Sequence, residues 1–322
     1  MRSAICTLFE SHYHYGLAVL VNSLCQQGYS GPVYAGYRGN LPFWASSAKS
    51  NLSLGWKGAV TLSVTQDIEI HFIPLTTDYH LTNYKPDFLL EVWDGPAREA
   101  ASMYYFDPDI TVCEKWNLFE HWTECGIALC EDINSPMAAY HPRRVAWRSY
   151  FSRENIRLTF KEATYANGGF VGVSRDNKAF LELWKQIQEK MGPAIGGLSR
   201  SSLTGPALPE EATSYFAPFP KTDQDALNAA IEAWEGQVSF VGKEGMGFCH
   251  GAIMMAHAIG SPKPWEKNFI LNALKGFKLS VADRNFWQYT GRPISTHSPV
   301  TIKVKNMSLI ASLFLNRFYV KS

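Results

Sequence analysis

The sequence predicts an α/β fold in which a mostly parallel central sheet carries helices on its faces. Short apolar runs typical of buried strands alternate along the chain with segments of helical spacing, and this alternation favours parallel strands joined by helices. The chain has 322 residues, of which 46% are hydrophobic and 18% charged. That length and composition suit either two domains or one large α/β domain with additions.

The first elements of this alternation lie near the N-terminus. The apolar run from Ser3 to Phe9 is expected to form a buried first strand. A helix is expected from Tyr15 to Leu24, because leucine and valine recur there on one helical face. Gly31-Pro32 then breaks the chain, and two more strands are expected over Val33–Tyr37 and Ile68–Ile73.

The alternation continues through the middle of the chain. Apolar runs follow at Phe88–Trp93 and Met103–Phe106, a strand is expected at Gly169–Val173, and helices are expected at Lys178–Lys190 and Asp225–Trp234. The run Met103–Phe106 ends at Asp107-Pro108-Asp109. Ligands of open α/β sheets bind beyond the carboxyl ends of the strands, so we expect Asp107 and Asp109 to point into that crevice.

Two segments depart from this pattern. Residues 192–220 are rich in Gly, Ser and Pro, and we expect a long loop there, either a mobile surface loop or a lid over a site. We expect residues 267–322 to form a small helical extension of a domain spanning residues 1–266. This extension has no acidic residue after Asp283, and it contains Arg284, Arg292, Lys303, Lys305, Arg317, Lys321 and the apolar run Met307–Tyr319. Such a helix can lie on an anionic membrane surface or dock on the core.

The net charge and the cysteine spacing indicate which partners and which cellular compartment to expect. The net charge of +1 implies no field for a polyanion, so no nucleic-acid partner is expected. The six cysteines form no Cys-x-x-Cys pair, and we interpret them as buried free thiols of a reducing compartment. The apolar run at the N-terminus is too short for a signal peptide, and no run approaches the ~20 residues of a membrane span. We therefore expect a cytoplasmic protein, at most peripheral on the inner face of a membrane.

Two motifs carry candidate chemistry. The carboxylates of Asp107 and Asp109 can bind one divalent cation, because hard cations prefer carboxylate oxygens and bridge to phosphates. Alone, Asp-x-Asp also fits a plain turn. The second motif, from His257 to Trp265, is more specific. His257 can complete a manganese site with two aspartates, Gly260 lets the backbone approach an anion, and Lys263 supplies a point charge for phosphate.

With these two motifs the chain resembles the retaining glycosyltransferases of the family that includes glycogenin and the bacterial lipopolysaccharide galactosyl- and glucosyltransferases. That family has a Rossmann-like GT-A fold, an Asp-x-Asp after a hydrophobic strand, and a late His-x-x-Gly-x-x-Lys-Pro-Trp. This sequence carries both motifs in the family's order, within roughly residues 3–266. The resemblance implies transfer of a hexose from a nucleotide diphosphate sugar, with Mn²⁺ or Mg²⁺ held by Asp107, Asp109 and His257.

The same resemblance implies roles for positions that bind the donor. The run Thr7–Tyr13, which includes Phe9, would meet the base and ribose, with Tyr13 stacking on the base and Glu10 accepting a hydrogen bond from uracil. This favours a UDP-sugar, although the family more often has Asp at the place of Glu10. Lys85 would lie near the donor diphosphate and sugar; a solvated lysine is the alternative.

Two further matches concern the sugar. By resemblance, Asn167 and Gly168 would touch the donor sugar, Asp223 would hydrogen-bond its hydroxyls, and Gln224 would lie beside the anomeric carbon. Purely structural roles are the alternatives: a bulge or turn at Gly168 and Gly169, and capping of a helix by Asp223. The acceptor would be a saccharide or a lipid-linked saccharide. A basic stretch, formed by Arg143, Arg144, Arg148 and Arg153, could meet an acidic or lipid-linked acceptor or form a solvated helix face.

Two rival functions remain open at this point. Asp107-Pro108-Asp109-Ile110-Thr111 also fits the Asp-x-Asp-x-Thr motif of haloacid dehalogenase-like phosphohydrolases, in which the first Asp attacks phosphate and the second is the general acid. Those enzymes place the motif on their first strand, whereas about a hundred residues of α/β pattern come before it here. The second rival is a binding module for nucleotide sugars that has no catalytic activity.

Overall fold

The computed structural model describes residues 3–318 and is built on a nine-stranded sheet with the order β10-β8-β9-β6-β1-β2-β5-β4-β3. The strands are β1 (Ser3–Glu10), β2 (Gly31–Arg38), β3 (Lys49–Ser50), β4 (Val60–Ser63), β5 (Ile68–Pro74), β6 (Ser102–Phe106), β8 (Ile127–Glu131), β9 (Ala166–Ser174) and β10 (Val238–Val241). Of these nine strands, β4 and β9 run against the direction of the others. The expected α/β fold with a mostly parallel central sheet is confirmed.

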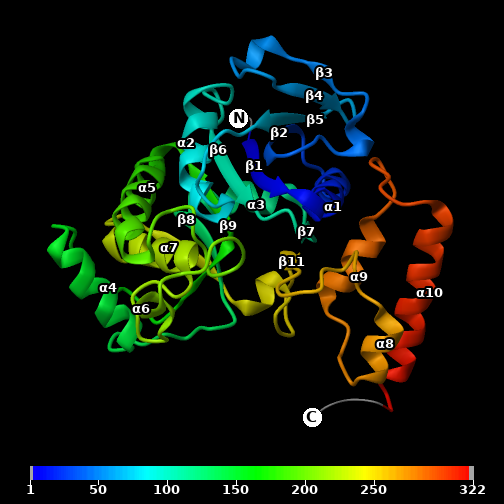
Figure 1. Cartoon of the computed structure of the whole chain (residues 1–322). Helices are drawn as coiled ribbons and strands as arrows, with labels where there is room; N and C mark the ends of the chain where they lie inside the picture. Colours follow the sequence, from blue (N-terminus) through cyan, green and yellow to red (C-terminus); the bar gives the residue numbers. More distant parts are fainter. Residues whose placement is uncertain (1–2, 319–322) are drawn as a thin grey trace.

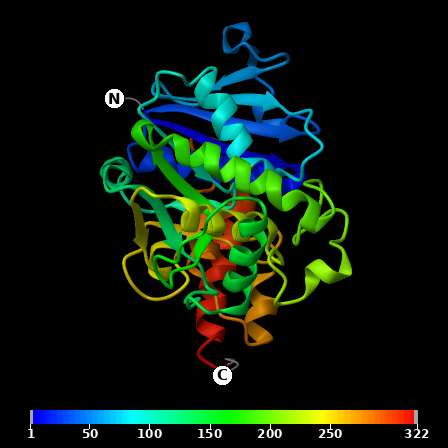
Figure 2. The ribbon, with the colours of Figure 1, turned by 90° about the vertical axis from the view of Figure 1, so that its left-hand side faces the viewer.

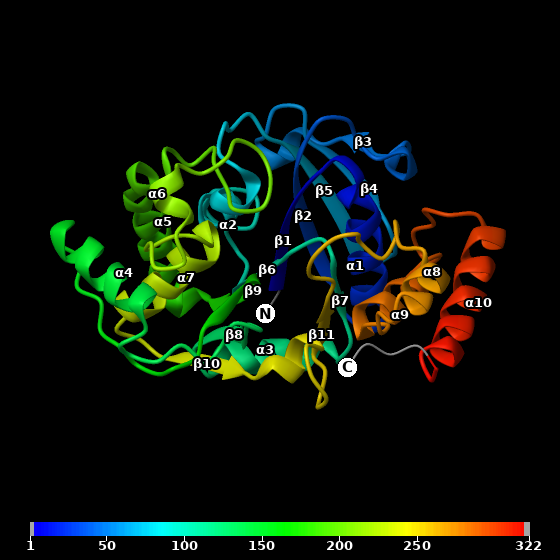
Figure 3. The ribbon, with the colours of Figure 1, turned by 60° about the horizontal axis from the view of Figure 1, so that its bottom comes forward.

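Helices cover both faces of this sheet, as Figures 1 and 3 show. They are α1 (His14–Gln26), α2 (Lys85–Asp94), α3 (Trp116–Glu124), α4 (Pro142–Arg153), α5 (Ala179–Met191), α6 (Glu210–Thr213), α7 (Thr222–Ala233), α8 (Phe269–Leu274), α9 (Val281–Tyr289) and α10 (Pro299–Leu315). In Figure 2 the helices α2 and α5 cross in front of the strands.

Strand β1 shows how the two faces are divided. Its side chains alternate between the faces, as the pleat of a strand requires. Cys6 and Leu8 belong to the core cluster that contains helices α2, α5 and α7, whereas Ile5 and Phe9 belong to the cluster that contains α1 and α3. Because β1 is buried on both faces, its residues form a nearly continuous apolar run in the sequence.

A small second sheet joins distant parts of the chain. Strands β7 (Ile110–Val112) and β11 (Met255–His257) pair antiparallel, and His257 lies opposite Ile110. The backbone N–H of Ala258 also donates to the carbonyl of Asp109 at 3.1 Å. This pairing holds the second motif against the residues that directly follow the first.

The C-terminal helices form a third group beside α1, on the right in Figure 1. Val19 of α1, Trp265, Trp287 of α9 and Leu309 of α10 share one apolar cluster. The expected helical extension is therefore present, although Tyr319 and Lys321 of the predicted basic, apolar terminus lie outside the described residues. Within residues 3–318 no helix combines the length and the apolar character needed to cross a bilayer.

Two expectations about local environment need correction. The cysteines are free, but of the six Cys125 and Cys249 are exposed, while Cys6 and Cys130 are buried. Arg143 and Arg144 form neither a surface for an acceptor nor a solvated helix face, because both side chains are buried in α4. The apolar run Phe88–Trp93 belongs to helix α2, where Pro86 near the helix start and a buried face that includes Phe88 and Trp93 favour a helix.

Candidate active site

A cavity of about 310 Å³ opens where the carboxyl ends of β1, β6 and β8 meet the start of β9. Every site residue predicted from the sequence lines it: Phe9, Glu10, Tyr13, Lys85, Asp107, Asp109, Asn167, Gly168, Asp223, Gln224, His257, Gly260 and Lys263. The start of α2 brings Lys85, and the start of α7 brings Asp223 and Gln224. The crevice at the carboxyl ends of parallel strands is the usual ligand site of open α/β sheets.

Three candidate metal ligands converge in this cavity. One ligand atom each from Asp107, Asp109 and His257 lies within 4.8 Å of the other two. His257 Nε2 is 3.3 Å from Asp109 Oδ1 and 3.9 Å from Asp107 Oδ2. Two carboxylates and an imidazole that share one small space form a donor set suited to a single divalent cation.

Close backbone approaches hold these ligands in place. A Cβ on Gly16 of α1 would lie 2.4 Å from the carbonyl oxygen of Pro108, so a glycine lets the helix pack against the Asp-x-Asp turn. A Cβ on Gly169 would lie 2.5 Å from Cε1 of His257. The imidazole therefore rests directly on the backbone of β9, at a position that any larger residue would fill.

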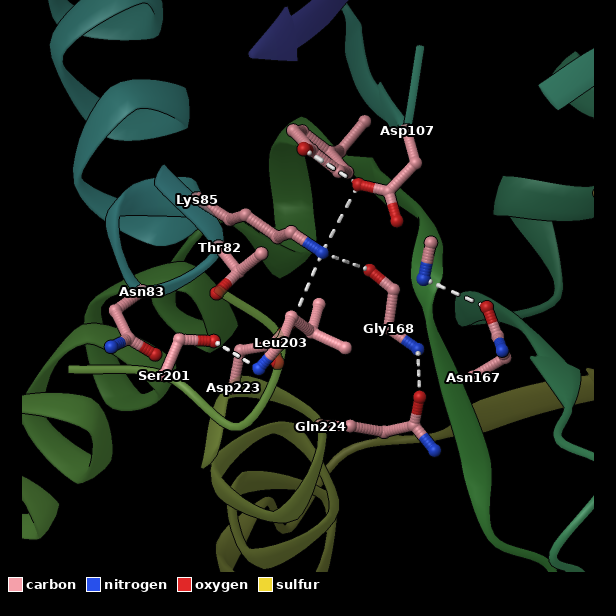
Figure 4. Close-up of polar contacts among 12 residues, drawn as sticks. Thr82, Asn83, Lys85, Asp107, Asn167, Gly168, Ser201, Leu203, Asp223 and Gln224 are labelled. Atoms are coloured by element: carbon pink, nitrogen blue, oxygen red, sulfur yellow. Dashed lines mark hydrogen bonds and ion pairs between the residues drawn. The ribbon is translucent and has the colours of Figure 1, made fainter. Parts of the chain in front are cut away.

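Lys85 ties the Asp-x-Asp motif to helix α7, as Figure 4 shows. Its ammonium group donates to Asp223 Oδ2 at 3.1 Å and to the carbonyl of Gly168 at 2.8 Å, and it lies 3.2 Å from Asp107 Oδ1. The residue is 1% exposed, which rules out a solvated surface lysine. Burial alone would lower the pKa of Lys85, but the carboxylates of Asp107 and Asp223 hold it above the usual value.

Lys263 forms the corresponding pair with the other aspartate. Its Nζ lies 2.5 Å from Asp109 Oδ2, and it also donates to the carbonyl of Ala258 at 2.7 Å. Burial would raise the pKa of the Asp109 carboxyl, but His257 and Lys263 together keep that pKa well below its usual range. Asp109 is thus held as a carboxylate, which is the form that binds a cation.

The residues expected near the sugar form a second polar group. Gln224 Oε1 accepts a hydrogen bond from the Gly168 N–H at 3.2 Å (Figure 4). Burial, together with nearby Asp107, raises the pKa of Asp223, and Lys85 opposes this rise. Asn228, one turn after Gln224, bonds both the N–H and the carbonyl of Ala166, at 2.7 and 2.9 Å. Helix α7 is therefore fastened to the start of β9.

The residues expected near the base also line the cavity. Tyr13 is half-buried, stacked on His12 and perpendicular to Trp265, with Lys263 Nζ 5.6 Å from its ring centre. Glu10 forms an ion pair with Arg38 at 3.2 Å. Phe9 is buried against Tyr37, so it contributes mostly to the core and only borders the cavity.

The loops around the cavity complete its walls. Gly260 has a φ of +76°, in the left-handed region that L side chains rarely adopt. Residues 192–220 are largely irregular, with a short 3-10 helix (Gly192–Ile195) and α6, and three of them, Ser202, Leu203 and Thr204, line the cavity. Thr204 Oγ1 lies 2.9 Å from His80 Nε2. The long loop therefore lies at the cavity, and it forms part of the cavity wall.

The basic stretch predicted from the sequence does not face this cavity as a free cationic surface. Arg143 pairs with Asp225 of α7 at 3.4 Å, and Arg144 pairs with Glu232 at 2.6 Å. All four side chains are at most 4% exposed. Charges buried in this way are stable only when they are paired, so the arginines of α4 support the helix that carries Asp223 and Gln224.

Sequence reasoning missed several polar residues of the site, of which three are described next. Tyr105 donates a hydrogen bond to Asp107 Oδ1 at 2.9 Å, Asp132 accepts one from Asn167, and His80 borders the cavity. Asp132 follows the short buried run 127–130, so a strand end with an acidic residue was the available signal. Tyr105 gave no signal, because an aromatic residue in an apolar run is usually part of the core.

Comparison with known proteins bears on the fold. No protein-family model and no curated protein sequence matches the chain. An active-site mutant of LgtC aligns with a TM-score of 0.51 at 14% identity, over 94% of this chain and 99% of that chain. The apo form of the glycosyltransferase GlyE from Streptococcus pneumoniae aligns with a TM-score of 0.50 at 14% identity, over 97% of this chain and 64% of that chain.

The bifunctional glycosyltransferase WbbM gives a lower TM-score of 0.45 at 12% identity, and the alignment covers 95% of this chain. This chain spans 52% of WbbM and 64% of GlyE, so it matches only part of those longer proteins. At these identities the likeness concerns the fold. The chain shares with LgtC the mixed α/β architecture with a large, mostly parallel central sheet.

Proposed function

We propose that the protein is a metal-dependent retaining glycosyltransferase that moves a hexose from a UDP-sugar to a hydroxyl of a saccharide or lipid-linked acceptor. One observation carries the proposal: Asp107, Asp109 and His257, from two distant motifs, bring their ligand atoms within 4.8 Å of one another inside a cavity. The fold shared with LgtC, which is a galactosyltransferase, and with GlyE is consistent with it.

The donor set fits Mn²⁺ or Mg²⁺. Carboxylate oxygens are the ligands that hard cations prefer, and Asp109 is held ionised in a buried position. A cation bound there would supply positive charge for the diphosphate of the donor. The ammonium group of Lys263 and the backbone at Gly260 border the same cavity and would stabilise the leaving diphosphate as its negative charge grows.

In the proposed reaction one bond breaks and one forms at the anomeric carbon. The bond from that carbon to the diphosphate oxygen breaks, the acceptor oxygen bonds to the carbon from the same face, and the acceptor proton passes to the departing phosphate. Asp223 would hydrogen-bond the sugar hydroxyls, and Gln224 would lie beside the anomeric carbon. Because Gln224 already accepts from the Gly168 N–H, its amide group has a fixed direction in the cavity.

The remaining donor contacts follow from the positions of the other cavity residues. Tyr13 would stack on the uracil ring, and Glu10 and Phe9 would border the base and ribose. Asn167 and Gly168 would lie against the sugar. Lys85 would act on the donor through Asp107 and Asp223, since its ammonium group is already bonded to both.

We further propose that residues 1–266 form the catalytic domain and that residues 267–322 attach it to the inner, anionic face of a membrane. The outer side of α10 supports this proposal, because Val304, Met307, Ile310 and Phe314 are 58 to 68% exposed there. Exposed Lys303 directly precedes them in the sequence, exposed Arg317 follows them, and the chain has no acidic residue after Asp283. Exposed apolar side chains flanked by basic ones are typical of helices that lie on anionic membranes. No nucleic-acid partner is proposed.

Hydrolysis of UDP-sugars in the presence of Mn²⁺ tests the proposal. We expect slow release of the sugar by the full chain and a loss of at least about a hundredfold in Asp109→Ala and His257→Ala, since a metal ligand is removed. Circular dichroism should show both variants folded. Asp176→Ala, which changes an exposed carboxylate, is the matched control.

The two rival functions predict different outcomes. A phosphohydrolase would release phosphate from simple phosphomonoesters and leave UDP-sugars intact. A binding module would bind UDP-sugars without turnover across donors and acceptors. Near-normal activity of His257→Ala with Mn²⁺ would refute the metal assignment.

A further inference from the structure

We propose that Asp132 and Asn167 are positioning residues that fix the imidazole of His257 with Nδ1 protonated and Nε2 free to bind a cation. The inference rests on the proposed metal site and adds to it a residue, Asp132, for which the sequence motifs assign no role. It stands on a chain of three buried side chains: Asp132 and Asn167 are 4% and 3% exposed, and the side chain of His257 is 8% exposed.

The first step is the orientation of the Asn167 amide. Its Nδ2 donates to Asp132 Oδ2 at 2.6 Å, and its Oδ1 accepts from the Gly169 N–H at 2.9 Å. A backbone N–H can only donate, so the group facing Gly169 must be the carbonyl oxygen, and the NH₂ must face the carboxylate. The two neighbours therefore fix the same orientation of the amide independently. Figure 4 shows Asn167 with its oxygen directed at the backbone of β9.

The second step is the tautomer of His257. Its Nδ1 lies 3.2 Å from the same Asn167 Oδ1. Because that oxygen has no proton to donate, Nδ1 must carry the hydrogen of this bond. In a neutral imidazole the lone pair is then on Nε2, which faces Asp109 Oδ1 and Asp107 Oδ2. A histidine that donates through one nitrogen presents the other as a metal ligand.

The third step is the anchoring of Asp132. Its Oδ1 accepts from the backbone N–H and the Nδ2 of Asn134, at 2.9 and 2.6 Å. Its own N–H donates to the carbonyl of Tyr165 at 2.8 Å, so the residue is tied to the start of β9 as well as to the end of β8. Asp132 is thus held rigidly at one end of the chain of contacts, and His257 lies at the other.

Direct observation of the tautomer tests this inference without any transfer reaction. In the full chain labelled with ¹⁵N-histidine and supplied with diamagnetic Mg²⁺, which would neutralise the two carboxylates that face Nε2, NMR should show Nδ1–H and an unprotonated Nε2 for His257. The signal is assigned by its loss in His257→Gln, since the chain has nine histidines. An Nε2–H tautomer of His257 in the wild-type chain would overturn the inference.

Mn²⁺ affinity, measured by electron paramagnetic resonance without nucleotide, supplies the second test. Asp132→Ala should bind Mn²⁺ about 10- to 100-fold more weakly, as for other residues that orient a ligand. Asp132→Asn retains a carbonyl oxygen for Asn167 and should recover part of that loss, and Asp176→Ala should bind as the wild type does. Unchanged Mn²⁺ affinity in Asp132→Ala would refute the positioning role.

The two proposals fail in different ways. A wild-type chain that shows the Nδ1–H tautomer but binds no Mn²⁺ supports the orientation of His257 and rejects the metal-dependent function. If Asp132→Ala does not fold, Asp132→Asn and the tautomer of the wild-type chain still decide the inference.

Discussion

At the scale of single residues, the site combines side chains that the sequence marks with side chains that only the fold brings in. Asp107, Asp109 and His257 were predictable, because their residue types and the Gly and Lys that follow His257 fit one chemistry. Asp132 was not predictable, since a single acidic residue after a strand has many roles. Its importance arises from a distance of 2.6 Å to Asn167, which depends on how β8 and β9 pair.

Two adjacent glycines allow a matched test at this scale. We expect Gly169→Ala to lower Mn²⁺ affinity at least about tenfold, because the new Cβ would lie 2.5 Å from His257 Cε1 and must displace this proposed metal ligand. Gly168→Ala should have a smaller effect, since its nearest contact is Asp223 Oδ2 at 3.3 Å. Titration of both variants by electron paramagnetic resonance measures the difference. Equal losses in the two variants would contradict the proposed packing of His257 on β9.

At the scale of elements, the sequence predicted best the parts that are buried on both sides. Strands β1, β2 and β5 were visible as apolar runs because each contributes side chains to the core clusters on both faces of the sheet. The edge strands β3 and β10, together with β4 beside β3, were missed, because they are short, contain no buried residue and lack that signal. Strand β11 was also missed as an element, because its three residues form a strand only by pairing with β7.

Helix α7 shows why a charge pattern alone misleads. The arginines of α4 looked like a surface feature, but Arg143 reaches Asp225, whose carboxyl also accepts from Tyr165 at 2.8 Å and from the Lys221 N–H at 2.7 Å. Burial raises the pKa of Asp225 to about 6, although Arg143 and the two hydrogen bonds oppose the rise. This ion pair cannot be read from sequence spacing, because the helices that carry the two residues meet only in the folded chain.

The raised pKa predicts a pH dependence of stability. Between about pH 4 and pH 6 the unfolded chain has released the proton of Asp225 while the folded chain retains it, so the free energy of unfolding falls as pH rises through this window. The contribution should reach about 3 kcal/mol, which is about two pKa units at ~1.4 kcal/mol each. Asp225→Asn cannot titrate and should lose less stability than the wild type over this range. Urea denaturation at both ends of the window measures the two slopes, and parallel slopes would contradict the assignment.

At the scale of the whole molecule, helices α8 to α10 lie beside α1 and leave one side of α10 uncovered (Figures 1 and 3). We expect the full chain to sediment with vesicles of phosphatidylglycerol and much less with phosphatidylcholine. Met307→Asp should weaken this binding about tenfold or more, because a charge replaces an apolar side chain that is 61% exposed. Ser152→Asp, on the exposed side of α4, is the control. Equal binding of wild type and Met307→Asp would refute the membrane proposal.

The pairing of β7 with β11 has a consequence for how the protein comes into being. During synthesis, the last strand of the large sheet ends at Val241, and strand β11 (Met255–His257) is made after it. A nascent chain can therefore contain every strand of the large sheet while His257 has not yet joined Asp107 and Asp109. The proposed cation site is therefore complete only after the last strand of the large sheet has been made, because His257 follows that strand in the sequence.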